Sequence, residues 1–303
     1  LKQSFNLIWG CLPSLQFEET WLRYLFHPYN NSIVHAHSGL DLSKLSSNNS
    51  NVLVESGLSL LHHKIDHNKL QLLHRLRQDR ISSLSKLGKI TLLHISDEEG
   101  LDGHKLYPLL PIGTRIFRNF YYPKFFANYK AITFPIGPRR EFLGFNSYKL
   151  SSQRKYPWAF MGTLWHSGNR NLAVSLFLRS LPQGLFFGGK HFGVGVSLDI
   201  YQDNLLNSVF CLCPEGDRHF DTFRLYECLQ MGSIPLVVER EGQAHKTLGS
   251  NFPLPIHESW QEALDYAIEN LMKPEKLDQI QSKVKIWWSN YKSELSIKVK
   301  HSL

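Results

Sequence analysis

Residues 208–240 constrain the fold of this chain more than any other stretch, because they predict a strand, a loop, a helix, a turn and a second strand in succession. Residues 209–213 form an apolar run that is long enough for a buried strand and too short for a helix. Gly232 fits the left-handed position after the helix, and residues 234–238 form the second apolar run. Two buried strands joined by a helix indicate a parallel sheet that is covered on both faces.

The loop in this stretch leaves the carboxyl end of the first strand, where open α/β sheets bind their ligands. It contains Glu215, Gly216 and Arg218, and Asp221 or Thr222 can cap the helix that follows. A helix N-terminus with a guanidinium group nearby is suited to a diphosphate. We therefore predict that these residues line an anion-binding site.

Arg224 and Glu227 are three residues apart, so they share one face of the first turns of this helix. We expect Arg224 to bind the diphosphate and Glu227 to accept hydrogen bonds from two vicinal ribose hydroxyls. The alternative is a surface helix on which the two side chains form a solvated ion pair.

The segments C-P-E-G and D-T-F-R-L-Y-E-C-L-Q-M-G-S-I-P-L-V resemble the signature of the exostosin family of glycosyltransferases, glycosyltransferase family 47. That signature has a small residue, an Arg, a Glu three positions later and then G-x-I-P-V. The resemblance implies an α/β fold of the GT-B type, in which two Rossmann-like domains face each other across a cleft. In that fold the C-terminal domain binds the nucleotide sugar, the N-terminal domain binds the acceptor, and the last helix crosses back to the first domain.

The remaining sequence agrees with two α/β domains, because predicted strands alternate with predicted helices. Residues 135–152 are rich in proline, glycine and polar residues, which indicates a linker. We expect an acceptor-side domain, a nucleotide-sugar domain and a C-terminal helix at residues 1–148, 149–280 and 281–303. Three of the shorter strands are predicted at residues 115–122, 129–134 and 252–256.

The net charge of +8 and the pI of about 9.2 indicate an anionic partner. The phosphates of a nucleotide sugar, an acidic glycan or an anionic membrane surface would fit this charge. Nucleic acid is not expected, because the sequence has no aromatic RNA-binding motif, zinc-ligand spacing or basic run. Trp287 and Trp288, on a basic C-terminal helix, either pack between the domains or form a membrane-surface patch with the nearby lysines.

The four cysteines, Cys11, Cys211, Cys213 and Cys228, do not form the framework of a secreted protein. Cys211 and Cys213 are two apart on one predicted strand and point the same way, which is poor geometry for a disulfide. This pattern indicates small buried side chains in a reducing compartment, so we expect a cytoplasmic location with membrane association left open. Animal members of the exostosin family are Golgi-anchored, so an anchor removed before Leu1 would imply the Golgi lumen instead.

The segment F-M-G-T-L-W-H-S-G-N-R at residues 160–170 predicts a strand, a glycine loop and the start of a helix. Gly162 permits a close approach to the backbone, and Arg170 lies near the helix start. The segment resembles the F-x-G motif that precedes an Arg in the exostosin family, which implies contact with the donor. The alternative is an ordinary glycine turn followed by a solvated Arg.

An inverting transferase needs a group that takes the proton from the acceptor hydroxyl. Asp97 and Glu98 follow a predicted strand at the carboxyl edge of the first sheet, so either is a candidate base. Asp97 could instead cap the next helix. His35 and His37 lie on the same side of another predicted strand and are alternative bases, but a metal site there lacks a third ligand.

The sequence has no D-x-D motif of the metal-dependent transferases, so we expect no metal cofactor. Retaining GT-B enzymes often carry a Glu at the position of His219, which favours inversion by analogy. The predicted function is the transfer of a sugar from a nucleotide sugar, with UDP the expected nucleotide, to a glycan hydroxyl. The alternatives are a GDP-fucose fucosyltransferase, whose similar helix has Lys at the position of Arg224, and a non-catalytic glycan-binding protein on the same fold.

Overall fold

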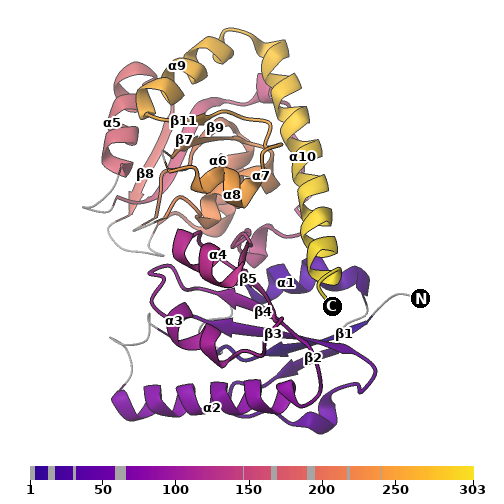
Figure 1. The fold of residues 1–303 in the computed structure, drawn as a ribbon. Helices are drawn as coiled ribbons and strands as arrows, with labels where there is room; N and C mark the ends of the chain where they lie inside the picture. The colour runs from indigo at the N-terminus through magenta and orange to yellow at the C-terminus, as the bar shows by residue number, and fades with distance from the viewer. Residues whose placement is uncertain are drawn as a thin grey trace. The chain divides into compact units, whose positions relative to one another are not determined.

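The computed structural model describes residues 4–12, 18–29, 32–58, 66–145, 147–164, 169–189, 195–216, 219–239 and 241–303 (Figure 1). The chain divides into two compact units, one of Leu1–Ile136 with Lys292–Leu303 and one of Gly137–Tyr291. The sequence places the domain boundaries at 148/149 and 280/281. The second division lies inside one continuous helix, so this helix contributes residues to both units.

The first unit is built on a parallel sheet with the strand order β2-β1-β3-β4-β5-β6. Its strands are β1 (Phe5–Trp9), β2 (Ser32–His35), β3 (Ser50–Ser56), β4 (Ile90–Ile95), β5 (Arg115–Arg118) and β6 (Ile132–Thr133). Its helices are α1 (Glu19–Phe26), α2 (His67–Ser85), α3 (Gly103–Leu106) and α4 (Pro123–Tyr129). Strands β1 and β4 are buried along their whole length, as expected of a parallel sheet that is covered on both faces.

Helices cover both faces of this sheet (Figure 1). Helix α2 packs on one face through Ile81 and Leu84, which share a core cluster with Ile8 of β1. On the other face, Phe26 of α1 meets Phe5 edge to face at 5.4 Å between ring centroids. Because successive strand residues point to opposite faces, β1 contributes to both cores.

The second unit is built on a parallel sheet with the strand order β11-β10-β9-β7-β8. Its strands are β7 (Tyr156–Thr163), β8 (Leu185–Gly189), β9 (Ser208–Leu212), β10 (Ile234–Val238) and β11 (Ile256–His257). Its helices are α5 (Arg170–Ser180), α6 (Leu198–Leu206), α7 (Phe223–Met231), α8 (Gln243–Leu248), α9 (Trp260–Leu271) and α10 (Pro274–Lys300). The prediction of parallel α/β sheets in both halves of the chain is confirmed.

The predicted crossover unit is confirmed as β9, α7 and β10. The two strands pair in parallel, and Gly232 ends α7 in the left-handed conformation, with φ 69°. On the side of α5 and α9, which lie side by side in Figure 1, Phe177 of α5 packs against Trp158 and Trp260, with 5.6 and 6.4 Å between ring centroids.

The C-terminal helix was predicted at residues 281–303. In the structure, helix α10 begins earlier, at Pro274, and ends at Lys300. Trp287 and Trp288 are 6% and 3% exposed, and their indole N–H groups donate to Asn251 and Gln230 within the second unit. Neither indole therefore forms a surface patch for a membrane. Further along the helix, Ser296 donates to the carbonyl of Leu25 in the first unit at 2.8 Å.

Three predicted strands are wrong in extent. Residues 129–134 were expected to be extended, but Pro123 starts helix α4, Lys130 ends it with φ 51°, and only Ile132–Thr133 remains as β6. Strand β5 ends at Arg118 because Phe120 has φ 58°, which no extended strand accommodates. In the last case prolines at 253 and 255 lack the N–H that a ladder needs, so β11 begins at Ile256.

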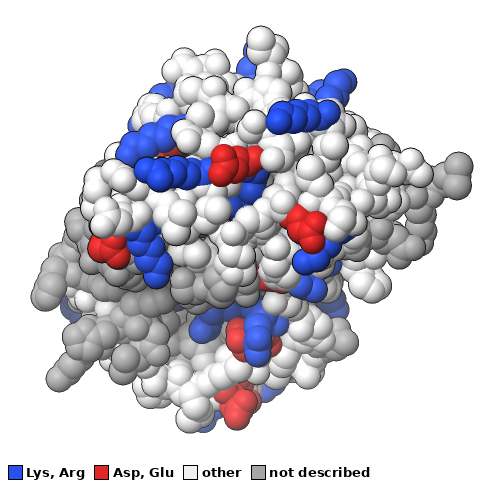
Figure 2. All heavy atoms as spheres, turned by 90° about the horizontal axis from the view of Figure 1, so that it is seen from below, with Lys and Arg blue, Asp and Glu red and all other residues white. Residues whose placement is uncertain are grey.

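The surface drawn in Figure 2 carries Lys and Arg side chains interspersed with Asp and Glu side chains. The basic side chains of the described residues do not gather into one continuous patch on this face. Among the helices of the described residues, none combines the length and the apolar composition that crossing a bilayer requires.

A buried network of charges joins α2 to the sheet of the first unit. Arg77 of α2 is 1% exposed and contacts Glu55 at 3.2 Å and Asp102 at 2.8 Å. His94 Nε2 lies 3.2 Å from the same oxygen of Asp102. Burial alone would raise the pKa of the Asp102 carboxyl, but His94 and Arg77 hold it well below its usual range.

We expect Asp102→Asn to destabilise the protein by about 3 kcal/mol at neutral pH, because it removes the nearer of the two carboxylate partners of the buried Arg77. Because the folded-state pKa of Asp102 is lowered, its contribution is present above the unfolded-state pKa and is lost as the pH falls through the folded-state value. Urea unfolding midpoints should therefore fall on acidification in the wild type and fall less in Asp102→Asn. Asp79→Asn, on the exposed side of α2, is the control, and an unchanged midpoint for Asp102→Asn at pH 7 would contradict this account.

Candidate functional site

The second unit brings together two of the predicted donor-site residues, Gly162 and Arg224. Gly162 lies in β7, and Arg224 lies in the first turn of α7. Arg224 Nη2 donates to the carbonyl of Met161 at 3.2 Å, and its guanidinium carbon lies 4.5 Å from the centroid of the Phe160 ring. A Cβ on Gly162 would lie within 3.0 Å of Arg224 Nη2, so the glycine makes room for the guanidinium.

The guanidinium of Arg224 is only partly satisfied by the described residues. Its Nε and Nη1 are buried and have no hydrogen-bond partner among those residues. Burial alone would lower the pKa of Arg224, but neighbouring groups that carry negative charge when ionised, Tyr201 first, raise it, so the side chain remains a cation. A buried cation with unused donors is suited to bind an anion such as a diphosphate.

Glu227 follows one turn later on α7 and is 2% exposed. It accepts hydrogen bonds from Arg139 Nε and, at 2.9 Å, from the hydroxyl of Tyr201. The alternative of a solvated ion pair with Arg224 is therefore wrong, since Glu227 is buried and its described ion pair is with Arg139. Each carboxylate oxygen has a second lone pair, so the ribose-binding role predicted for Glu227 is compatible with these contacts.

Arg139 and Tyr201 are residues of this site that the sequence did not reveal. Arg139 stacks over the ring of Tyr201 at 5.4 Å. Burial alone would lower the pKa of Arg139, but the charge of Glu227 raises it. Tyr201 lies on α6, and burial raises its pKa. The basic pair Arg139–Arg140 in the predicted linker was the one available signal.

Arg170 is 7% exposed and joins the ends of two neighbouring strands. Its Nη1 donates to the carbonyl of Thr163 at 2.8 Å, and its Nε donates to the carbonyl of Glu215 at 2.9 Å. The Glu215 carboxylate in turn accepts from Asn169 Nδ2 at 3.1 Å. Arg170 therefore positions the loop after β9, and the alternative of a solvated Arg is wrong.

The same loop continues into the start of α7. Gly216 donates to the carbonyl of His219 at 2.6 Å, and Asp221, which is 2% exposed, accepts from the hydroxyl of Tyr226. Thr222 occupies the position before α7, but its side chain makes no cap hydrogen bond, and its buried Oγ1 has no partner among the described residues. Arg218, also predicted for this site, lies outside the described residues.

In the first unit, the carboxylate of Asp97 is buried and contacts neighbouring protein groups. Its side chain is 1% exposed, its two oxygens accept from the N–H groups of Asp102 and Gly103 at 3.1 and 3.3 Å, and Arg118 Nη2 lies 3.3 Å away. This geometry favours the helix-capping alternative, because the accepted N–H groups lie at the start of α3. Glu98 is half-buried, and its carbonyl accepts from the hydroxyl of Tyr122.

Glu18 is a buried acid at the same edge of the sheet that the sequence did not single out. It is 4% exposed, its Oε1 accepts from the hydroxyl of Ser96 at 2.8 Å, and its buried Oε2 has no partner among the described residues. Burial raises the pKa of Glu18 to about 7. Its only sequence signal is an acid next to an apolar helix, in F-E-E-T at residues 17–20.

Among the described residues, His35 and His37 do not converge on a common metal position. His35 ends β2, with Nε2 3.6 Å from Glu19 Oε1, and His37 follows the strand. Among the described residues, Cys211, Cys213 and Cys228 form the only group of three or more side chains that could hold a metal ion. His35 and His37 are therefore not part of such a group.

The structure resembles a solved alpha-glucosyltransferase in complex with UDP and a 13-mer DNA containing a central A:G mismatch. The TM-score is 0.54, the sequence identity is 10%, and 98% of each chain is covered. This likeness shows the fold, and the structural neighbours are GT-B glycosyltransferases, so the predicted fold class is confirmed. With a buried arginine at the carboxyl edge of the second sheet, the chain has the characteristics of a glycosyltransferase.

A family model described as the RXYLT1 C-terminal domain matches residues 140–303, and the chain belongs to this family of glycosyltransferases. Ribitol-5-phosphate xylosyltransferase 1 from Homo sapiens is 26% identical over 175 residues, and the protein of the same name from Mus musculus is 25% identical over 175 residues. Each alignment covers 49% of this chain and 38% of the relative, so the matched part is well under half the length of these curated relatives. The predicted donor-site residues all lie within the range that the family model matches.

We expect Gly162→Ala to weaken nucleoside diphosphate binding, because the added methyl group displaces the Arg224 guanidinium from the Met161 carbonyl. Without nucleotide, the unfolding temperatures of Gly162→Ala and the wild type should differ by less than any increase that UDP produces in the wild type. Gly195→Ala is the control, because no described atom lies within 4 Å of its added Cβ. An unchanged response to UDP in Gly162→Ala would show that the guanidinium position does not matter for binding.

Proposed function

We propose that this chain carries the catalytic apparatus of an inverting, metal-independent glycosyltransferase that uses a UDP-sugar. The observation that carries the proposal is the buried Arg224 guanidinium, whose Nε and Nη1 have no partner among the described residues. In the proposed reaction the acceptor hydroxyl oxygen attacks the anomeric carbon as the bond to the diphosphate oxygen breaks. Arg224 neutralises the departing diphosphate, which is the largest charge that develops in such a step.

The other residues of the site have supporting roles in this proposal. Glu227 accepts hydrogen bonds from the ribose hydroxyls, held in place by Arg139 and Tyr201. The backbone at Gly162 and Gly216 lines the phosphates, and Arg170 fixes the loop between them. The name of the curated relatives makes xylose the first sugar to test and a ribitol-phosphate acceptor the first partner to test, and the net charge of +8 fits a phosphorylated acceptor.

Arg224→Ala should abolish the stabilisation that UDP gives in the absence of metal, and should lower kcat/KM by about 100-fold or more, since one preorganised electrostatic partner is lost. The measurement is thermal unfolding with UDP, GDP or ADP, without metal and then with Mg²⁺ or Mn²⁺. Arg179→Ala is the matched control, because Arg179 is an exposed arginine of the same unit whose Nε donates to a backbone carbonyl of its own helix.

Each outcome of this experiment has a distinct meaning. Stabilisation by UDP alone that is lost in Arg224→Ala supports the donor site. Stabilisation by GDP alone would favour the GDP-fucose alternative, and a requirement for Mg²⁺ or Mn²⁺ would overturn metal independence. A folded protein that responds to none of the nucleotides would favour a non-catalytic glycan-binding protein.

We propose that the acceptor proton is taken by a carboxylate of the first unit. Asp97 and Glu98 were the candidates from the sequence, but both carboxylate oxygens of Asp97 already accept from backbone N–H groups, and Arg118 lies beside one of them. Glu18 is the better base in the structure, because a carboxyl with a pKa near 7 is poised to accept a proton at neutral pH.

Glu18→Gln should lower kcat by about 100-fold and remove the rise of activity with pH that is centred near pH 7. The raised pKa also predicts a stability effect, since stability is lost as the pH rises from about 4.5 to about 7. Glu18→Gln should therefore unfold at a higher temperature than the wild type at pH 8 and at a similar temperature at pH 4. Glu98→Gln is the comparison, and loss of the pH dependence in that variant alone would assign the base to Glu98.

A further inference from the structure

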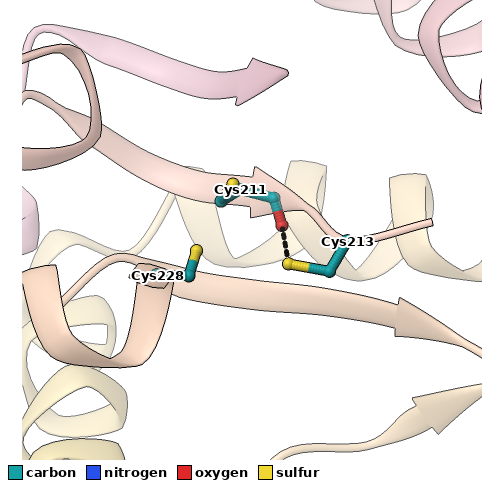
Figure 3. A group of neighbouring side chains, drawn as sticks. All are labelled: Cys211, Cys213 and Cys228. Atoms are coloured by element: carbon teal, nitrogen blue, oxygen red, sulfur yellow. Dashed lines mark hydrogen bonds between the residues drawn. The ribbon is translucent and has the colours of Figure 1, made fainter. Parts of the chain in front are cut away.

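Three of the four cysteines converge in the interior of the second unit. Cys211 lies in β9, Cys213 follows the end of that strand, and Cys228 faces them from α7 (Figure 3). Their three sulfur atoms lie within 4.8 Å of one another, and each side chain is at most 1% exposed. All three thiols are free.

The topology explains how these thiols meet. Residues two apart on a strand point to the same side, so β9 directs Cys211 and Cys213 toward one face of the sheet. Helix α7 crosses that face and returns the chain to β10, which places Cys228 opposite them. The Cys213 thiol donates to the carbonyl of Cys211 at 3.5 Å, and this contact leaves its sulfur lone pairs available.

We propose that Cys211, Cys213 and Cys228 form a buried thiolate site for a soft metal ion, and that Cu(I) is the ion that fits it best. Thiolate ligands select Cu(I) and other soft ions over hard ones such as Mg²⁺. With metal–sulfur bonds of about 2.3 Å, three sulfurs around one ion are about 4 Å apart. The sulfurs therefore need to approach by less than about 1 Å.

The number of ligands separates Cu(I) from zinc. Structural zinc sites are almost always tetrahedral with four protein ligands. Among the described residues, no His, Asp or Glu side chain completes this group to four. The three cysteine side chains are also buried, which disfavours an ion that keeps a hydration shell. Three-coordinate sulfur ligation at a buried site therefore favours the soft monovalent ion.

The charge of the surroundings is compatible with this assignment. The Arg224 guanidinium is close enough to stabilise negative charge on Cys211 and Cys213. Each thiol that binds as a thiolate releases one proton to the solvent, and no oxidant or reductant is required. Cu(I) held by two thiolates and one thiol carries a single negative charge, which balances the single positive charge of Arg224.

The experiment is a competition between the reduced full-length chain and a chromophoric Cu(I) chelator under anaerobic conditions. We expect the wild type to withdraw one Cu(I) per chain, and Cys211→Ser and Cys228→Ser to bind at least 10-fold more weakly. Cys11→Ser is the matched control, because Cys11 is equally buried but belongs to the first unit. It should bind Cu(I) as the wild type does.

A second measurement needs no variant and covers the case in which a substitution prevents folding. X-ray absorption of the Cu(I)-loaded wild type should show three sulfur neighbours per copper. No withdrawal of Cu(I) by the wild type, an equal loss in Cys11→Ser, or a preference for Zn²⁺ would overturn the assignment. So would a mass two hydrogens lower with no metal, which would indicate a disulfide. None of these readouts uses a nucleotide, so the outcome is independent of the proposed transferase activity.

Discussion

The packing of the Arg224 guanidinium against the backbone of β7 is the contact on which the site in the second unit depends. It requires a glycine at 162, the aromatic ring of Phe160 next to the guanidinium, and the start of helix α7 at Phe223, which places Arg224 in its first turn. Burying a cation is costly unless it is paired and hydrogen-bonded. Here only one described hydrogen bond satisfies it, to the Met161 carbonyl. This cost agrees with the proposal that Arg224 is kept charged to bind a ligand rather than to stabilise the fold.

The other charged side chains of the site have contacts of their own. Glu227 is paired with Arg139, which comes from a segment well separated from it in sequence, so the carboxylate is balanced without using Arg224. Arg170 donates to the carbonyls of Glu215 and Thr163 and so fixes the loop between two strands. Two nitrogens of the buried Arg224 guanidinium have no hydrogen-bond partner among the described residues, and the thiols of Cys211 and Cys213 are nearby groups that can respond to its charge. The proposed donor site and the proposed thiolate site share this one guanidinium.

The sequence predicted the parts of this arrangement that are local. The crossover unit of β9, α7 and β10 follows from apolar runs, a glycine at the end of the helix and the strand–helix order. Gly162 and Arg224 were each predicted from their own segments, and the strand order then brings β7 beside β9. Arg139 and Tyr201 could not be predicted, because they reach Glu227 from segments that carry no motif. The convergence of Cys228 with Cys211 and Cys213 likewise needs the tertiary fold. In the first unit, the aromatic residues between Pro123 and Phe134 fit a helix or a strand equally well, and the left-handed turn at Lys130 decided between them.

The acids at the carboxyl edge of the first sheet show why a sequence pattern does not identify a catalytic base. Asp97 has the position that the pattern requires, but its two oxygens are occupied by backbone N–H groups and Arg118. Glu18 comes from a different element and reaches the same edge through the hydroxyl of Ser96, which is a neutral donor. With so little to stabilise its charge, burial dominates and raises its pKa to about 7. The proposal of Glu18 rather than Asp97 as the base therefore depends on the contacts around each carboxyl group, and those contacts join segments far apart in the chain.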